Sequence, residues 1–184
     1  MFSYFFDKKA FCLLWKNRSN DQKSTLRQDF LLGAYTWVLG APITLVIGQT
    51  FDLLLCLFFG FTTYEQIAVH QLKLALDSPL LLTSTLLAVF ITAPIIEEFL
   101  FRGILQNMLK KYVSQKNALV IAAFFFALIH ISPSQGLGNI SLFFSLFTFG
   151  CFLGFVYEKQ GSLLAPIALH MTFNAITTLQ ILSI

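Results

Sequence analysis

Charged residues inside a long apolar stretch are the feature that most constrains this sequence. Residues 79–109 form a run long enough to cross a lipid bilayer, and its only charged residues are Glu97, Glu98 and Arg102. Ionisable groups at membrane depth are costly, so their presence indicates a functional site. A structural ion pair between helices would need one glutamate and one arginine, and here a second glutamate is left over.

The composition places the chain among polytopic membrane proteins. Of the 184 residues 57% are apolar and 11% are charged, and the mean hydropathy is +0.75. The basic residues lie between the apolar stretches, where they encode orientation in a membrane, so the net charge of +3 does not indicate binding of nucleic acid. Three scattered cysteines favour neither a disulfide framework nor a CxxC metal site.

Apolar segments separated by turn signals predict an all-α bundle of about five transmembrane helices, with a conical or clefted site inside the membrane. Residues 62–78 are expected to form a loop, after which Ser78 and Pro79 have the chemistry that starts a helix. Pro94 predicts a kink one turn before the glutamates, and Asn117 is expected to cap the third helix. The predicted crossings are residues 30–61, 79–110, 118–131, 139–157 and 162–181.

Two regions are expected, a basic segment at residues 1–29 and a single transmembrane domain at residues 30–184. The first region holds six of the twelve Lys and Arg residues, interleaved with aromatic residues, which fits an interfacial segment and a flexible tail equally well. Ten of the twelve Lys and Arg residues lie in three places: before the first crossing, between the second and the third, and between the fourth and the fifth. These sides, and with them the N-terminus, are therefore predicted to be cytoplasmic.

Polar residues on three predicted helices fall at one depth. With a rise of about 1.5 Å per residue, Glu97, His130 and Asn174 each lie roughly 20 Å from the cytoplasmic end of their helix, and His170 lies one turn closer to it. A lone histidine on an apolar helix more often makes an interhelical hydrogen bond. Unrelated structural residues would have no reason to agree in depth, so the agreement predicts a shared site.

Helical spacing predicts a role for each residue on the second helix. Glu98 and Arg102 are four residues apart, so they can pair on one face of the helix. Glu97 lies about 100° round the helix and stays free to act as a general base on a water molecule. His130, on the adjacent helix, could help to hold that water.

The last helix and the wall of the site complete the predicted chemistry. His170 and Asn174 are four residues apart and can donate to one oxyanion, while Phe126 is expected to pack the wall one turn before His130. No Ser or Cys lies in a nucleophile motif, and Ser132 has no recognisable elbow around it, which leaves hydrolysis by activated water. One glutamate and two histidines also suit zinc, but the HExxH motif is absent.

Three motifs, in this order on successive helices, resemble the CPBP family of CAAX prenyl endopeptidases and bacteriocin-processing or bacteriocin-immunity proteins, also called the Abi family. The resemblance spans residues 80–175. It implies an all-helical intramembrane endopeptidase of the glutamate type without a cofactor, whose oxyanion hole is His170 with Asn174. It also implies that Glu97 is the base, that His130 assists it, and that Glu98 and Arg102 support the site. The motifs are Glu97-Glu98-x-x-x-Arg102, Phe126-x-x-x-His130 and His170-x-x-x-Asn174.

The expected protein is a multi-pass peptidase of a bacterial cytoplasmic membrane that cuts a membrane-associated peptide or protein. Its partners would be that substrate and the lipid bilayer. Three alternatives stay open: a non-catalytic bacteriocin-immunity or scaffold protein with the same helical core, a zinc-dependent peptidase, and a small transporter with a carboxylate proton relay. The transporter is disfavoured because the sequence shows no inverted repeat.

Overall fold

The computed structural model describes residues 26–61 and 66–182, and every element within them is helical. The predicted all-α fold is confirmed. Most of the predicted basic segment lies outside the described residues, but helix α2 already begins at Leu26, four residues before the predicted start of the first crossing. The elements are α2 (Leu26–Phe59), α3 (Ile67–Ala75), α4 (Pro79–Leu87), η2 (Ala88–Thr92), α5 (Ala93–Glu98), η3 (Phe99–Gln106), α6 (Asn107–Leu109), α7 (Gln115–Leu128), η4 (Pro133–Gln135), α8 (Gly138–Gln160) and α9 (Leu164–Leu182).

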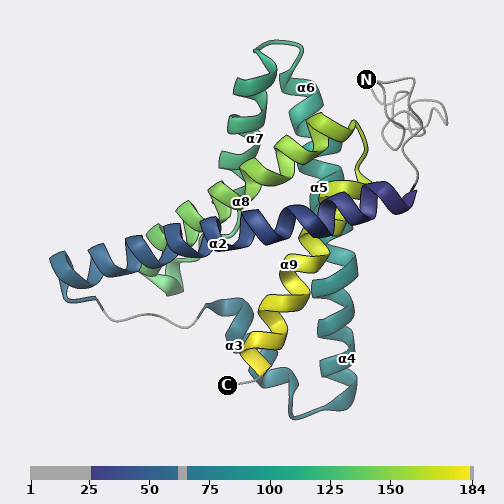
Figure 1. The fold of residues 1–184 in the computed structure, drawn as a ribbon. Coiled ribbons are helices and arrows are strands. Elements are labelled where there is room, and N and C mark those ends of the chain that lie inside the picture. The colour runs from purple at the N-terminus through teal and green to yellow at the C-terminus, as the bar shows by residue number, and fades with distance from the viewer. Residues whose placement is uncertain (1–25, 62–65, 183–184) are drawn as a thin grey trace.

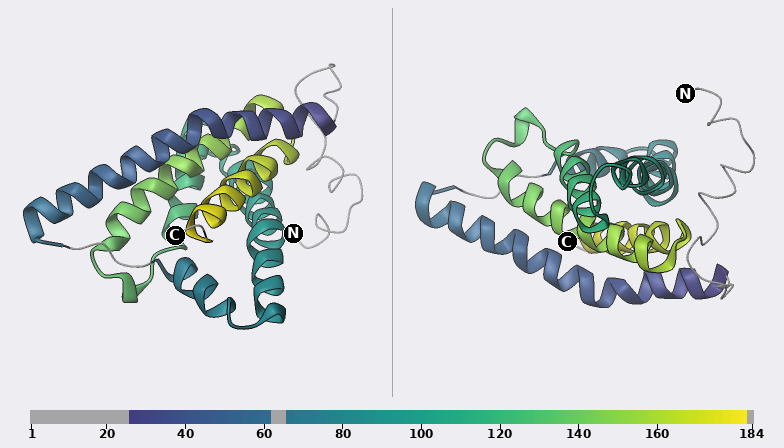
Figure 2. Two further views of the ribbon diagram at one scale, coloured as in Figure 1. Left: turned by 60° about the horizontal axis from the view of Figure 1, so that its bottom comes forward. Right: turned by 90° about the horizontal axis from the view of Figure 1, so that it is seen from above.

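The helices pack in three layers, with α8 and α9 in the middle (Figures 1 and 2). Helix α2 crosses one face of this middle layer and contacts both of its helices. On the other face, α7 packs against α8, while η2 and α5 pack against α9. The middle layer therefore lies between α2 and the segments that carry Glu97, Glu98 and Phe126.

Glycines on one face of α2 allow its backbone to approach the middle layer closely. Gly33 lies against the backbone of Ala165, and Gly48 lies against the side chain of Ser145. Small residues are the usual means by which membrane helices reach such short separations. This region forms the single helix α2, which contains Pro42 and is long and apolar enough for the predicted single crossing.

The predicted helix from Pro79 is a continuous helical run to Leu109, with Ser78 at its N-cap. Near Pro94 the backbone hydrogen bonds of this helix change from the α-helical to the π-helical pattern. Segment η2, which ends two residues before the proline, is a π-helix, and the N–H of Ala93 donates to the carbonyl of Ala88, five residues back. A second π-helical segment, η3, follows the glutamates. We hereafter call residues 79–109 the site helix.

The region predicted as a loop at residues 62–78 contains helix α3, so that prediction is wrong for its second half. Leu72 and Ala75 are buried, because α3 turns an apolar face onto α4. His70 is exposed on the same helix. The short helix is stabilised by tertiary packing, which the mixed composition of its segment does not reveal.

Two helix ends also differ from prediction. Helix α7 is capped by Ser114, whose hydroxyl accepts from the N–H of Asn117 at 3.3 Å, so Asn117 is not the cap. Helix α8 runs through Glu158 to Gln160 and ends only at Gly161, whose φ of 63° suits a glycine C-cap.

Among the described residues, three helices are long and apolar enough to cross a membrane: Arg27–Phe59, Pro79–Leu109 and Gly138–Gln160. The predicted number of five crossings is therefore not confirmed. Helix α7 has 14 residues, fewer than the roughly 20 that a perpendicular crossing needs. Helix α9 has 19 residues, but His170, Asn174 and Gln180 lower its hydropathy.

Replacing Gly33 by alanine is expected to destabilise the protein by about 1–3 kcal/mol, because the new Cβ would overlap the backbone of Ala165. Gly40→Ala is the matched control on the same helix, since its Cβ would lie 3.5 Å from Phe152, an ordinary contact. Thermal unfolding in detergent micelles measures both variants. Equal unfolding temperatures for the two variants would contradict the close approach of α2 and α9.

Candidate active site

The site is built on a buried ion pair within the site helix. Arg102 Nη1 donates to Glu98 Oε1 at 3.0 Å, and both side chains are fully buried. Arg102 Nη2 also donates to the backbone carbonyl of Gly150 on α8 at 2.9 Å. The predicted pairing of Glu98 with Arg102 is confirmed, and the arginine additionally ties the site helix to α8.

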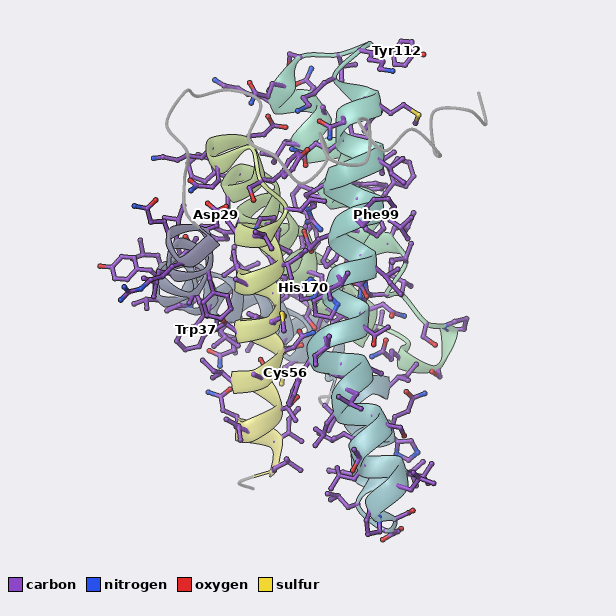
Figure 3. The ribbon with its side chains drawn as sticks, turned by 90° about the vertical axis from the view of Figure 1, so that its right-hand side faces the viewer. Asp29, Trp37, Cys56, Phe99, Tyr112 and His170 are labelled. Atoms are coloured by element: carbon purple, nitrogen blue, oxygen red, sulfur yellow. The ribbon has the colours of Figure 1, made fainter. Side chains whose placement is uncertain are left out.

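His170 joins the same carboxylate from α9. Its Nδ1 lies 2.8 Å from Glu98 Oε1, and the residue is 5% exposed. Figure 3 shows His170 where α9 runs beside the site helix. Glu98 therefore holds one side chain of its own helix and one of α9 in fixed positions.

The side chain of Glu97 faces both His130 and His170 and is partly exposed. Its Oε2 lies 3.8 Å from His130 Nε2 and 4.0 Å from His170 Nε2, and its side chain is 20% exposed, whereas that of Glu98 is fully buried. Oε2 itself is buried and accepts no hydrogen bond from any residue that the structure describes. His130 Nδ1 lies 2.7 Å from the carbonyl oxygen of Phe126, one turn earlier.

Phe126 forms the wall, as predicted. The residue is 1% exposed, and its ring lies edge-on to Phe101 at 5.4 Å between centroids. The guanidinium carbon of Arg102 lies 4.6 Å from the ring centroid, a cation–π contact. The rings of His130 and His170 lie 5.0 and 5.8 Å from it. One aromatic ring thus contacts both histidines and the arginine.

Asn174, on α9, contacts the site helix away from the two glutamates. Its amide nitrogen donates to the carbonyl oxygen of Val89 in η2 at 2.9 Å. The structure therefore brings Glu97, Glu98, His130 and His170 together, while the amide of Asn174 contacts a backbone group eight residues before Glu97. The catalytic roles of all these residues stay predictions.

Glycines of α8 are part of the site, and the sequence analysis did not identify them. A Cβ on Gly150 would lie 3.1 Å from the Cβ of Ala123, and one on Gly154 would lie 2.8 Å from the Cγ of Leu119. These glycines let α8 approach α7 closely and expose the Gly150 carbonyl to Arg102. Their spacing of four residues is the small-xxx-small pattern of membrane helix contacts, which could have identified them.

The ring of Phe149 was also missed. It lies edge-on to His170, with 5.4 Å between the ring centroids, and is 2% exposed. In an α8 segment with many phenylalanines, no sequence signal separates this ring from its neighbours.

Within the described parts of the chain, no group of three or more His, Cys, Asp or Glu residues is arranged to hold a metal ion.

The sequence model of one known family matches residues 79–176, more than half of the chain, and that family is described as type II CAAX prenyl endopeptidase Rce1-like. The chain belongs to this family. The match runs from the start of the site helix to just past Asn174, so it includes every predicted site residue. It confirms the resemblance to the CPBP family, a group of CAAX-type intramembrane proteases.

A curated relative, an uncharacterized 24.3 kDa protein of Escherichia coli, is 33% identical over 87 residues. The alignment covers 47% of this chain and 39% of the relative, so the chain matches about two fifths of that protein's length. No solved structure matches the chain.

Replacing Arg102 by methionine is expected to destabilise the fold by about 3–5 kcal/mol, because Glu98 keeps its charge in a buried position without its partner. The double variant with Glu98→Gln should lose less, because no uncompensated charge is left. Thermal unfolding in detergent measures both. The control is Lys110→Met, which breaks the partly exposed pair with Glu158 and should cost about 1 kcal/mol or less. A double variant less stable than Arg102→Met alone would contradict this account.

Proposed function

We propose that the protein is an intramembrane endopeptidase that hydrolyses a peptide bond of a membrane-associated peptide or protein through a water molecule activated by Glu97 and His130. The observation that carries the proposal is the position of Glu97 Oε2, buried and within 4.0 Å of the Nε2 atoms of two histidines on different segments. Such separations are suited to a bridging water. Membership of a CAAX protease family supports the reaction class.

The hydrogen bond of His130 determines how the water would bind. The Phe126 carbonyl can only accept, so Nδ1 of a neutral His130 carries the proton and Nε2 presents a lone pair. The Glu97 carboxylate is also an acceptor. A water between them would donate one hydrogen to each and keep its oxygen lone pairs for attack on a carbonyl carbon.

His170 is suited to stabilise the oxyanion. The ion-paired Glu98 accepts from Arg102, so His170 Nδ1 donates to the same oxygen. The charges of Glu98 and Arg102 cancel, and Glu97 leaves one negative charge in the cluster. A proton on His170 makes the cluster neutral and lets Nε2 donate to the oxygen that becomes negative.

The reaction then requires one proton transfer in each direction. Glu97 takes a proton from the water as the oxygen forms its bond to the carbonyl carbon. When the carbon–nitrogen bond breaks, the protonated Glu97 gives that proton to the leaving amine. No other reactant is needed, and the products are a carboxylic acid and an amine.

Basic residues at one end of the bundle support an orientation with that end in the cytoplasm. Lys110 pairs with Glu158 at 2.8 Å, and Gln160 hydrogen-bonds to Asp29, so the ends of α6 and α8 and the start of α2 lie together. This end carries Arg27, Lys110, Lys111, Lys116 and Lys159. We therefore propose that the N-terminal end of α2 is cytoplasmic and that the protein resides in the cell membrane.

Replacing Glu97 by glutamine should reduce cleavage at least about 100-fold, because the amide cannot accept the proton of the water. The unfolding temperature should stay unchanged, since the amide is nearly isosteric. The assay uses purified protein in detergent and a fluorogenic peptide that ends in a farnesylated CAAX sequence, with the unprenylated peptide alongside. Asp77→Asn, the same change at an exposed turn residue, is the control.

Full cleavage by Glu97→Gln would refute the proposal. If neither peptide is cut, peptides that accumulate in membranes of cells producing Glu97→Gln, relative to wild type, are sought by mass spectrometry. A protein that only binds a partner would leave the two peptide profiles the same, and that result would favour an immunity or scaffold function.

Cleavage is expected to persist after dialysis against EDTA and in the presence of 1,10-phenanthroline. The proposed base is the carboxylate of Glu97 itself, so the water needs no metal ion to become a nucleophile. A zinc enzyme would lose its activity with the chelators and regain it on addition of zinc. Such loss and recovery would replace the proposed mechanism by the zinc-dependent one.

A further inference from the structure

The carbonyl of Val89 has no backbone donor in the register of its helix. In η2 hydrogen bonds run from a residue to the carbonyl five residues back, and the N–H of Ala93 accordingly donates to Ala88. The next donor in this series, for the carbonyl of Val89, would be residue 94. That residue is Pro94, which has no N–H.

The amide of Asn174 supplies the missing donor. Its Nδ2 lies 2.9 Å from the Val89 carbonyl oxygen. A backbone carbonyl without a partner is expensive within a membrane, because no water is available to satisfy it. A side chain of α9 thus completes the hydrogen bonding of the site helix at the point where the proline interrupts it.

We infer that Asn174 is a positioning residue that fixes the depth of α9 against the site helix. His170 lies one turn earlier on α9, so the bond between Asn174 and Val89 sets which residues of the site helix His170 meets. With that bond in place, His170 reaches both Glu97 and Glu98. The consequence for catalysis rests on the proposed function, whereas the consequence for stability does not.

This role differs from the oxyanion donor that the family resemblance implies. The Asn174 amide donates to a backbone carbonyl of the site helix, and the positioning role requires only this one bond.

A double-mutant cycle between Asn174→Ala and Pro94→Ala tests the inference. An alanine at position 94 restores a backbone N–H, so the site helix can satisfy the Val89 carbonyl without α9. With Pro94 present, Asn174→Ala should lower the rate on the farnesylated CAAX peptide about tenfold or more and lower the unfolding temperature. In the Pro94→Ala chain, the same change should cost less than about twofold in rate. Thr177→Ala, on the same helix, is the control.

An equal loss from Asn174→Ala in both chains would overturn the inference and indicate a direct contact with the substrate. The proposed function would survive that result, because it is tested separately by Glu97→Gln. If the wild-type protein does not cut the peptide, the proposed function is in question, but the cycle can still be read from unfolding temperatures, which need no substrate.

Asn174→Asp provides a test if the proline variant does not fold. A protonated aspartic acid can donate to the Val89 carbonyl, whereas the carboxylate can only accept and would be repelled. The variant should therefore approach wild-type stability in acid and lose stability as the pH rises through the titration of the carboxyl group. An unfolding temperature that follows that of the wild type at every pH would overturn the inference.

Discussion

The buried ion pair of Glu98 and Arg102 is the interaction on which the arrangement of the site depends. Two charges without access to water are tolerated only when each is closely paired and hydrogen-bonded. The guanidinium meets this requirement by donating to Glu98 and to the Gly150 carbonyl, and the carboxylate by also contacting His170. Satisfying one ion pair therefore joins three helices: the site helix, α8 and α9.

Two adjacent glutamates acquire different chemistry from this arrangement. Glu98 is fully buried and neutralised by Arg102, which makes it a fixed acceptor for His170. Glu97, one residue earlier, points to another side of the helix, keeps partial exposure and lies close to two imidazole nitrogens. The rotation of about 100° between successive residues is enough to separate a fully buried, ion-paired carboxylate from a partly exposed one.

Much of the site could be predicted from the sequence because helical spacing and depth depend only on counting residues. The pairing of Glu98 with Arg102 and the meeting of Glu97 with His130 and His170 follow from a fixed rise and rotation per residue. Counting fails where the register changes. The π-helical turn before Pro94 determines the partner of Asn174, and a residue pattern does not show whether a proline kinks its helix or shifts its hydrogen bonds.

Other misses have a related cause, because they depend on neighbours distant in sequence. Helix α3 exists because Leu72 and Ala75 find an apolar surface on α4. The glycines of α2 and α8 matter because of what faces them, such as Ala165 or Ala123. The predicted five crossings are not confirmed, because among the described residues only three helices meet the length and hydropathy that a crossing needs.

The length of α2 has a consequence for how the helix lies in the bilayer. Its 34 residues extend about 50 Å, against a hydrocarbon layer of about 30 Å, and the helix crosses the site helix obliquely (Figure 1). The two helices therefore cannot both stand upright in the bilayer. A helix of this length fits the hydrocarbon layer by tilting, because tilt shortens its extent along the membrane normal.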